Sequence, residues 1–299
     1  MSVFHAFAPA KINLYLHITG KRDDGYHRLD SLVAFTNIGD ALRLEPAPSF
    51  SFVVEGPMAG ALAGQPTEGN LVVRAARGLA VALGLPPDPL PPVRLTLVKN
   101  LPVASGIGGG SSDAAAALRL LAAHWGVGAD DPRLHNVAAS LGQDVPCCID
   151  ATTCYLCDVG ATTEPGPLLP HTDIVLVNPN KALPTPAVYK ARTGGFVPPA
   201  RLEHAPRDAR ELADMLAARG NGLTDAACHI LPDVRDVLTQ IAATPDCLLA
   251  RMSGSGATCF GLYPDRAAAR KAASDLLAAR PDWWVVPAFV PTAEATTKA

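Results

Sequence analysis

The sequence predicts a two-domain protein of the α+β class. Its 299 residues suffice for two domains, at roughly 100 to 200 residues per domain. Segments with the two-residue alternation of strands stand between segments with helical patterns in both halves. A stretch rich in glycine, proline and threonine, residues 160–170, separates the halves. We therefore expect an N-terminal domain at 1–160 and a C-terminal domain at 161–299.

The N-terminal half is expected to hold strands at 11–19, 41–45, 50–54 and 93–98. In the first of these, aliphatic side chains alternate with polar ones, which is the period of a strand with one buried face. Lys11 and Asn13 occupy its other positions, so both are expected to project from the opposite face.

Two helices are expected in the same half. Asn70 is a preferred N-cap residue, and the helix that follows it ends before Gly84. Ser111 or Ser112 caps a helix rich in alanine and leucine that ends before Gly126.

The second half repeats this mixture of elements. Strands are expected at 173–177, 247–252, 257–263 and 283–289, and helices at 208–219, 226–242 and 265–279. This half should therefore have a core of its own.

The amino-acid composition and the net charge exclude several classes of function. With 48% hydrophobic and 18% charged residues, the chain is not expected to be disordered. Its formal net charge of -3 provides no general positive field for nucleic acid or an anionic membrane. No apolar run reaches the roughly 18 residues of a membrane span. We expect a cytoplasmic protein that binds a small molecule and neither nucleic acid nor membrane, and any anionic ligand must be held locally.

The seven cysteines are an odd number in a large chain, unlike the evenly paired cysteines of small secreted domains. Reduced thiols are therefore expected. Cys154 and Cys157 form a CxxC pair, but no second pair stands at zinc-finger spacing. The apolar residues between them favour a buried strand over a metal or redox site.

The strongest local signal lies between the strand at 93–98 and the alanine-rich helix. It consists of Pro102, Val103, Ala104, Ser105, Gly106, Ile107, Gly108, Gly109, Gly110, Ser111, Ser112 and Asp113. Four glycines let a ligand approach the backbone closely, and the first turn of the following helix points its N–H groups at one place, which suits a phosphate. The Lys-Ser or Lys-Thr of a Walker A loop is missing and the GxGxxG spacing fails. A flexible connection is the alternative.

A second Gly/Ser turn, residues 253–256, joins two predicted strands of the C-terminal half. Glycine in a tight turn is ordinary. As a hairpin connection this turn needs no function.

Two charged residues stand beside apolar segments. Asp144 comes directly before residues 145–149, which we expect to form a strand, and on its own is typical of a cap or turn aspartate. Lys11 on its own is typical of an exposed residue whose stem covers its neighbours. Together with a phosphate-binding loop they supply a carboxylate and a cation, which phosphoryl transfer to an alcohol requires.

The loop at 19–29 carries Tyr26 and His27 directly after a glycine. A tyrosine ring would stack on a base, and an imidazole would hydrogen-bond the edge of that base. A surface pair without a ligand is the alternative.

Three segments resemble the motifs of the GHMP kinase superfamily, in the same order: residues 9–14, 102–114 and 253–258. The resemblance covers essentially the whole chain. It implies a two-domain α+β GHMP kinase fold, with an N-terminal domain like domain 2 of ribosomal protein S5 and a ferredoxin-like C-terminal domain. Residues 9–31 and the string GQDVPCC at 142–148 further resemble the branch that phosphorylates a cytidine diphosphate-linked methylerythritol.

This resemblance implies an ATP-dependent kinase. The γ-phosphate of ATP would pass to the 2-hydroxyl of the methylerythritol unit, with Mg²⁺ assisting, in the non-mevalonate route to isoprenoid precursors. Two rivals are a catalytically silent nucleotide-binding protein of the same fold and a superfamily enzyme with another acceptor, such as homoserine or mevalonate. The oligomeric state and the Mg²⁺ ligands stay open.

The resemblance also implies roles for residues around ATP. Asp144 would be the catalytic base and Lys11 its charged partner. The backbone of residues 102–112 would wrap the ATP phosphates, with Asp113 beside it. The adenosine side would be lined by Asn70, Leu71 and Lys99.

The remaining roles concern the second substrate. Tyr26 and His27 match the pair that binds cytosine, and Tyr189 matches an aromatic residue on the other face of the base. Asn13 and Thr185 fall beside the erythritol and phosphate path.

Two positions depart from the usual pattern of this branch. Gln143 stands before the aspartate where alanine or serine is common, and Gly222 removes a carboxylate from a stretch that usually reads Asn-Asp-Leu. Lys11, Asp144 and the glycine-rich loop are unaffected by these departures, so the kinase interpretation is kept.

Overall fold

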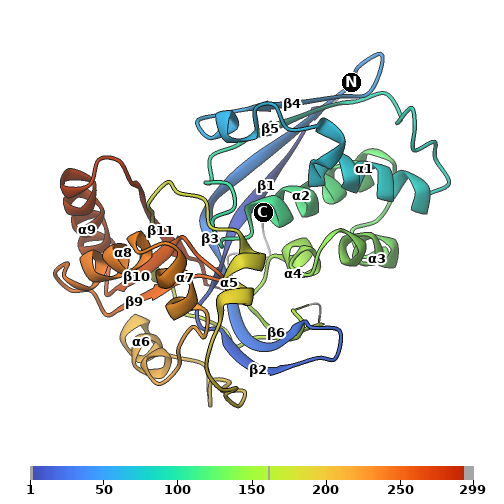
Figure 1. The fold of residues 1–299 in the computed structure, drawn as a ribbon. Coiled ribbons are helices and arrows are strands. Elements are labelled where there is room, and N and C mark those ends of the chain that lie inside the picture. Colours follow the sequence, from blue (N-terminus) through green and yellow to red (C-terminus); the bar gives the residue numbers. More distant parts are fainter. Residues whose placement is uncertain (1–2, 161, 293–299) are drawn as a thin grey trace. The chain divides into compact units, whose positions relative to one another are not determined.

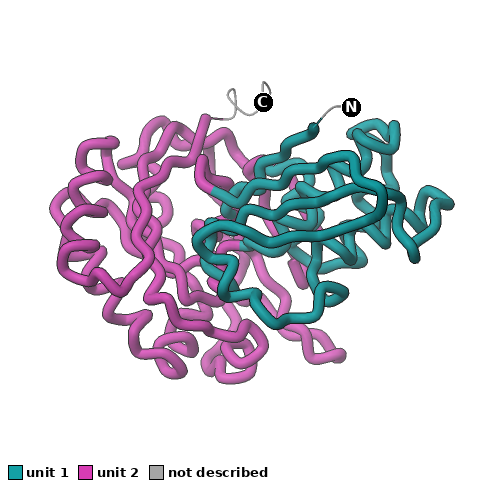
Figure 2. The backbone as a smooth tube through the Cα atoms, turned by 90° about the horizontal axis from the view of Figure 1, so that it is seen from above, with its two compact units in different colours: residues 1–10, 39–103, 108–151 teal, residues 11–38, 104–107, 152–299 magenta. Residues whose placement is uncertain are grey.

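The computed structural model describes residues 3–160 and 162–292, which form two compact units (Figure 2). Unit 1 combines the N-terminal residues up to Ala10 with 39–103 and 108–151. Unit 2 combines 11–38 and 104–107 with the chain from Thr152 onward. Each unit gathers segments that lie far apart in the sequence, and the glycine-rich loop contributes to both. The expected domain boundary at residue 160 stays a prediction.

Unit 1 contains a sheet made from β4 (Ser51–Glu55), β5 (Arg94–Val98) and the C-terminal part of β3 (His27–Glu45). β5 pairs parallel to β4 and antiparallel to β3. β1 (Phe4–Asn13) also pairs with β3. The strands predicted at 41–45, 50–54 and 93–98 are confirmed, although β3 begins much earlier than the sequence indicated.

Helices α1 (Leu71–Ala82), α2 (Gly109–His124), α3 (Pro132–Leu141) and α4 (Val145–Asp150) pack against one another within unit 1 (Figure 1). α1 begins as predicted, because the side chain of Asn70 accepts a hydrogen bond from the N–H of Val72 at 2.9 Å. An N-cap of this kind satisfies one of the N–H groups that the first turn leaves unpaired.

The predicted serine cap of α2 is wrong. α2 begins at Gly109 and follows Gly108, whose φ of 64° lies in the left-handed region that favours glycine. The hydroxyl of Ser112 instead donates to the carbonyl of Pro9 at 2.6 Å. Glycine, not serine, therefore turns the chain into this helix.

The strand expected at 145–149 is also wrong, since these residues begin α4. All five are buried, and a short apolar run does not distinguish a buried strand from a buried helix. Pro146 stands in the first turn of the helix, where its missing N–H costs nothing.

In unit 2, the N-terminal part of β3 pairs antiparallel with β2 (His17–Lys21) and with β6 (Cys154–Asp158), and β6 pairs with β7 (Thr162–Pro165). β6 confirms the strand predicted for the CxxC pair. The single strand predicted at 11–19 is wrong, because β1 ends at Asn13 and β2 begins at His17. Between them, the N–H groups of Leu14 and Leu16 donate to the carbonyls of Leu32 and Gly220. Two partners on different segments prevent one continuous strand.

The rest of unit 2 contains an antiparallel sheet in the order β11 (Trp284–Val290), β8 (Thr172–Asn178), β10 (Cys259–Tyr263) and β9 (Leu249–Met252). Its helices are α5 (Thr185–Ala191), α6 (Ala209–Ala217), α7 (Thr224–Ile230), α8 (Asp233–Ala242) and α9 (Arg266–Ala279). The first strand in the chain lies between the last and the third, which is the order of a ferredoxin-like sheet.

The helix predicted at 226–242 is two helices. α7 ends at Ile230 and α8 begins at Asp233, with Pro232 at the N-cap position. Proline has no N–H to continue a helix, and it disfavours the helical conformation of the residue before it. The helices predicted at 208–219 and 265–279 are confirmed as α6 and α9.

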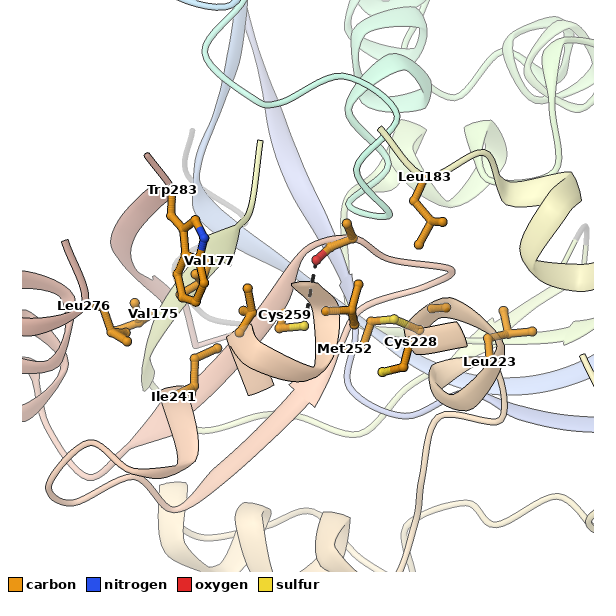
Figure 3. Close-up of a cluster of buried hydrophobic side chains, with 14 of the residues drawn as sticks. Val175, Val177, Leu183, Leu223, Cys228, Ile241, Met252, Cys259, Leu276 and Trp283 are labelled. Atoms are coloured by element: carbon orange, nitrogen blue, oxygen red, sulfur yellow. Dashed lines mark hydrogen bonds between the residues drawn. The ribbon is translucent and has the colours of Figure 1, made fainter. Parts of the chain in front are cut away.

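The core of unit 2 lies between the antiparallel sheet and its helices. Val175 and Val177 of β8 belong to one buried cluster with Ile241 of α8, Leu276 of α9 and Trp283 (Figure 3). Burying aliphatic or aromatic side chains of this size stabilises by about 1.5 to 3 kcal/mol each. Met252 and Ala257, both completely buried in this cluster, flank the turn at 253–256. The core therefore holds that turn at both of its ends.

The seven cysteines are free thiols. Across residues 3–160 and 162–292, no helix has both the length and the apolarity for crossing a membrane. Within the same ranges, no three histidine, cysteine, aspartate or glutamate side chains are grouped so that they could hold a metal ion.

Candidate active site

Unit 1 brings together Asn70, Leu71, Lys99 and residues 108–113 of the predicted nucleotide site, while residues 104–107 belong to unit 2. A Cβ on Gly110, in the first turn of α2, would lie 3.5 Å from Leu71, and a Cβ on Gly109 would lie 3.1 Å from the Nζ of Lys99. Asn70 is the N-cap of α1, directly before Leu71. The first turn of α2 therefore lies beside the start of α1 and the end of β5.

The first turn of α2 suits an anion. The first N–H groups of a helix have no partner within the helix, and the helix dipole favours negative charge at that end. α2 is 16 residues long, so the dipole is well developed. Gly110 is exposed in this turn and leaves the backbone open to a ligand, whereas Gly109 leaves room for the ammonium of Lys99 on the inner side.

The ammonium group of Lys99 lies between two buried carboxylates. Nζ donates to Oδ2 of Asp40 at 2.5 Å and to Oδ2 of Asp113 at 2.7 Å. All three side chains are at most 5% exposed. Lys99 was predicted to line the adenosine side, whereas Asp40 was not predicted from the sequence.

The pKa values of this triad follow from burial and charge. Burial lowers the pKa of Lys99, but the two carboxylates outweigh it, so the pKa of Lys99 is raised. Burial raises the pKa of Asp113 to about 8, with Lys99 opposing the shift and Asp40 reinforcing it. Lys99 is therefore charged at neutral pH, while Asp113 holds a proton through much of the neutral range.

Asp144 occupies the N-cap position of α4. The predicted cap position is therefore confirmed, but the side chain of Asp144 makes no capping hydrogen bond. Its carbonyl accepts a hydrogen bond from the thiol of Cys147 at 3.1 Å.

The far end of α4 is bound to α2 by Arg119. The guanidinium donates to the carbonyls of Cys148 at 2.8 Å and Ile149 at 2.9 Å, and also to that of Phe7 at 2.8 Å. Cations near a helix C-terminus are favourable. Arg119 therefore fixes the helix that carries Asp144, a role that the sequence did not indicate.

Unit 2 brings the three sequence motifs into contact. The N–H of Asn13 donates to Oγ of Ser253 at 3.0 Å, and that hydroxyl donates to the carbonyl of Gly106 at 3.0 Å. The N–H of Lys11 donates to the carbonyl of Ile107 at 3.0 Å. The turn at 253–256 is therefore more than a hairpin connection, because it holds the first half of the glycine-rich loop.

Lys11 and Asn13 are 3% and 2% exposed, so the interpretation of Lys11 as an exposed surface residue is wrong. The amide nitrogen Nδ2 of Asn13 donates to Oγ of Ser31 at 2.8 Å. Its carbonyl oxygen Oδ1 is buried and has no hydrogen-bond partner among the described residues. A buried acceptor of this kind is costly unless a ligand supplies a donor.

Two predicted substrate residues share one face of α5. Thr185 and Tyr189 are four residues apart, which places them one above the other. The hydroxyl of Thr185 lies 2.7 Å from that of Ser255, so α5 is tied to the turn at 253–256.

The ring of Tyr189 lies against the ring of His27, with centroids 5.4 Å apart and an interplanar angle of 31°. The two rings are already in contact, so a base would bind against this pair and not between them. Tyr26 is 56% exposed. Burial, followed by the charges of Arg192 and Lys21, lowers the pKa of His27 below its usual value. His27 is therefore neutral at pH 7 and keeps both a donor and an acceptor.

Comparison with known proteins decides the family. Residues 70–157 match the model of the GHMP kinases N terminal domain, and residues 201–281 match that of the GHMP kinases C terminal. A protein of Paramagnetospirillum magneticum named 4-diphosphocytidyl-2-C-methyl-D-erythritol kinase is 54% identical over 96% of this chain and 99% of its own length. The protein of the same name from Gluconacetobacter diazotrophicus is 49% identical over 94% of this chain and 93% of its own.

The chain belongs to the 4-diphosphocytidyl-2-C-methyl-D-erythritol kinase family.

Solved structures agree with this assignment. A crystal structure of 4-(cytidine 5'-diphospho)-2C-methyl-D-erythritol kinase matches with a TM-score of 0.78 and 33% identity, covering 96% of this chain and all of that one. The homoserine kinase from Cytophaga hutchinsonii matches with a TM-score of 0.71 at 14% identity, which shows the fold alone. The predicted α+β GHMP kinase fold is confirmed.

Membership of this kinase family fixes the class of reaction. The protein is a small-molecule kinase, and ATP is the phosphate donor of the GHMP kinases. The catalytically silent alternative and the alternative acceptors are not favoured. The roles of individual residues stay predictions.

Proposed function

We propose that this protein transfers the γ-phosphate of ATP to the 2-hydroxyl of 4-diphosphocytidyl-2-C-methyl-D-erythritol. The products are the 2-phosphate and ADP, and the reaction belongs to the non-mevalonate route to isoprenoid precursors. The observation that carries the proposal is the 54% identity, over almost the whole chain, with a kinase named for this substrate.

Unit 1 supplies the nucleotide side. The first turn of α2 receives the ATP phosphates on its N–H groups, and Asn70, Leu71 and Lys99 line the adenosine side. Support comes from the position of Leu71 and Lys99 beside Gly110 and Gly109. Residues 102–107 complete the path of the loop around the phosphates.

Asp144 and Lys11 act on the acceptor. Asp144 orients the 2-hydroxyl and takes its proton late, since a loose phosphoryl-transfer transition state needs little nucleophilic push. Lys11 stabilises the negative charge that develops. Attachment of α4 to α2 through Arg119 holds Asp144 steady for this task.

Mg²⁺, when bound, neutralises charge on the phosphate oxygens during transfer. The start of α2 fits this ion. Ser111 is half-buried there, and the buried Oδ1 of Asp113 has no hydrogen-bond partner among the described residues. Ser112 fits less well, because its hydroxyl donates to Pro9. Mg²⁺ commonly uses one or two protein ligands and completes its shell with phosphates and water.

The cytidine end of the substrate binds to unit 2. His27 hydrogen-bonds the edge of the cytosine, and the rings of Tyr189 and Tyr26 stack on its faces, at about 1 to 3 kcal/mol per stacked base. Asn13 and Thr185 contact the erythritol and phosphate part. The unpartnered carbonyl oxygen of Asn13 supports this placement, because it needs a donor such as a hydroxyl group.

The protein acts in the cytoplasm. The seven free thiols support this, because reduced cysteines are typical of that compartment.

The first test is ³¹P NMR of the purified protein with Mg-ATP and each of three acceptors: 4-diphosphocytidyl-2-C-methyl-D-erythritol, homoserine and mevalonate. A new phosphomonoester signal is expected with the first acceptor only. Asp144→Asn should lower the transfer rate by roughly 10²- to 10⁴-fold and leave ATP binding intact.

Asp150→Asn is the matched control, because Asp150 stands on the same helix with its side chain 62% exposed. This variant should transfer phosphate at the native rate. No transfer to any acceptor by the native protein, with ATP still bound, would contradict the proposed function.

A further inference from the structure

A buried residue outside the glycine-rich loop controls where that loop begins. We propose that Asp40 is a positioning residue for nucleotide binding, which holds the start of α2 in place through Lys99 and through the backbone of Asn100 and Leu101. This inference rests on the proposed function, because it places the ATP phosphates at the first turn of α2.

Asp40 is completely buried, and both of its oxygens have donors. Oδ1 accepts hydrogen bonds from the N–H groups of Asn100 at 2.6 Å and Leu101 at 2.9 Å, while Oδ2 accepts from Lys99 at 2.5 Å. The three donors are consecutive residues directly after β5. A buried carboxylate is costly unless it is paired and hydrogen-bonded in this way. Asp40 therefore fixes the direction in which the chain leaves β5 and enters the loop.

Lys99 connects Asp40 to α2. Its Nζ donates to Asp113, the fifth residue of the helix, at 2.7 Å. A Cβ on Gly109, the first residue, would lie only 3.1 Å from the same Nζ. The ammonium therefore packs against the first turn of α2 from inside the unit, and a displacement of Lys99 would move the N–H groups that face the phosphates.

The hydrogen bonds of the two carboxylates explain why Asp40, and not Asp113, is the positioning residue. The carboxylates of Asp40 and Asp113 together carry one more negative charge than the ammonium of Lys99 neutralises. Both oxygens of Asp40 are satisfied, whereas Oδ1 of Asp113 has no hydrogen-bond partner among the described residues. Asp40 is therefore the fully bonded carboxylate of the triad, while Asp113 keeps one oxygen for a ligand.

Asp40→Asn tests the proposal. The amide keeps the size of the side chain and an acceptor for the two N–H groups, but it loses the charge that holds Lys99. The dissociation constant of Mg-ATP, measured by calorimetry without any acceptor, should rise roughly 10- to 100-fold. Removal of a negative charge near a phosphate would on its own strengthen binding. Weaker binding therefore identifies positioning and excludes simple charge removal.

Kinetics give a readout that a merely structural residue would not move. Because Asp40 acts on the N–H groups that face the phosphates, Asp40→Asn should raise the KM for ATP, while kcat at saturating ATP changes little.

Asp173→Asn is the matched control, because Asp173 is a buried aspartate of β8 in the other unit, paired with His171. It should leave ATP affinity unchanged. Native ATP affinity in Asp40→Asn would overturn the proposal. So would a loss of ATP affinity that comes together with a fall in kcat and a lower melting temperature, because that pattern indicates loss of structure only.

Gly109→Ala keeps the proposal testable if Asp40→Asn does not fold. The added Cβ presses on Lys99 without changing any charge, and alanine favours a helix over glycine. Weaker ATP binding at an undiminished melting temperature is expected, and native affinity would overturn the proposal. ATP binding is measured without the acceptor, so native ATP affinity with no phosphate transfer would contradict the proposed substrate and leave the role of Asp40 standing.

Discussion

The glycine-rich loop depends on one contact that only glycine allows. Gly106 has a φ of 77°, and a Cβ placed on it would lie 2.6 Å from the carbonyl oxygens of Ser253 and Gly256. Both oxygens are backbone atoms, so they cannot move aside as the end of a flexible side chain could. The carbonyl oxygen of Gly106 accepts a hydrogen bond from Ser253. A Cβ placed on Gly254 would lie only 2.8 Å from that oxygen. Two glycine turns therefore fit against each other in unit 2.

Gly106→Ala should separate these turns. Strain at positive φ and the clash with the backbone should lower the free energy of unfolding by about 2 kcal/mol or more, and phosphate transfer should fall with it. Urea denaturation and a steady-state assay measure the two effects. Gly128→Ala is the control, since a Cβ there meets nothing within 4 Å. An alanine at 106 with native stability would show that the two turns are not in this contact.

Sequence patterns selected the candidate residues of the site but did not indicate the contacts between them. The glycines, Lys11 and Asp144 stand in motifs that indicate chemistry without a structure. Asp40 stands 59 positions before Lys99 and in no motif, so only the folded chain places it beside the loop. Burial of Lys11 was likewise missed, because alternation along one strand does not indicate what covers its second face.

At the scale of elements, each error of prediction has an identifiable physical cause. Period-two and helical patterns correctly indicated β5, β6, α1, α6 and α9. The errors fell where a short apolar segment fits either structure, as in α4, or where a proline divides a helix, as between α7 and α8. Tertiary contacts decided the segment between β1 and β2, whose backbone is bound by two different partners.

The attachment of α4 to α2 gives a prediction at this scale. Arg119→Lys keeps the positive charge, but one ammonium lacks the planar fork that reaches three carbonyls. The end of α4 should loosen, and kcat should fall by roughly tenfold with little change in the KM for ATP. Arg133→Lys is the control, because Arg133 lies on the surface of α3, paired with Asp131. An equal change in kcat and in the KM for ATP would contradict a role through Asp144.

At the scale of the whole molecule, each unit is built from segments that are distant in sequence. Ser253 and Gly106 are 147 positions apart and in contact, while Asp40 and Asn100 are 60 apart. No local pattern encodes such pairs. The family resemblance implied the fold, because the motifs and their separations are shared with proteins of known fold. Local helix and strand propensities carry no information about contacts between distant segments.

The buried triad of Asp40, Lys99 and Asp113 should leave a signature in global stability. The pKa of Asp113 is raised from 3.8 to about 8 in the folded state, so between these values the folded protein holds a proton that the unfolded chain releases. The free energy of unfolding therefore falls as the pH rises through this window, by at most about 1.4 kcal/mol per pH unit. Asp113→Asn removes this slope. Urea denaturation of both proteins at pH 5 and pH 8 measures the effect. Between pH 5 and pH 8 the native protein should lose more free energy of unfolding than the variant does. Equal changes in the two proteins would mean that Asp113 is ionised throughout this range.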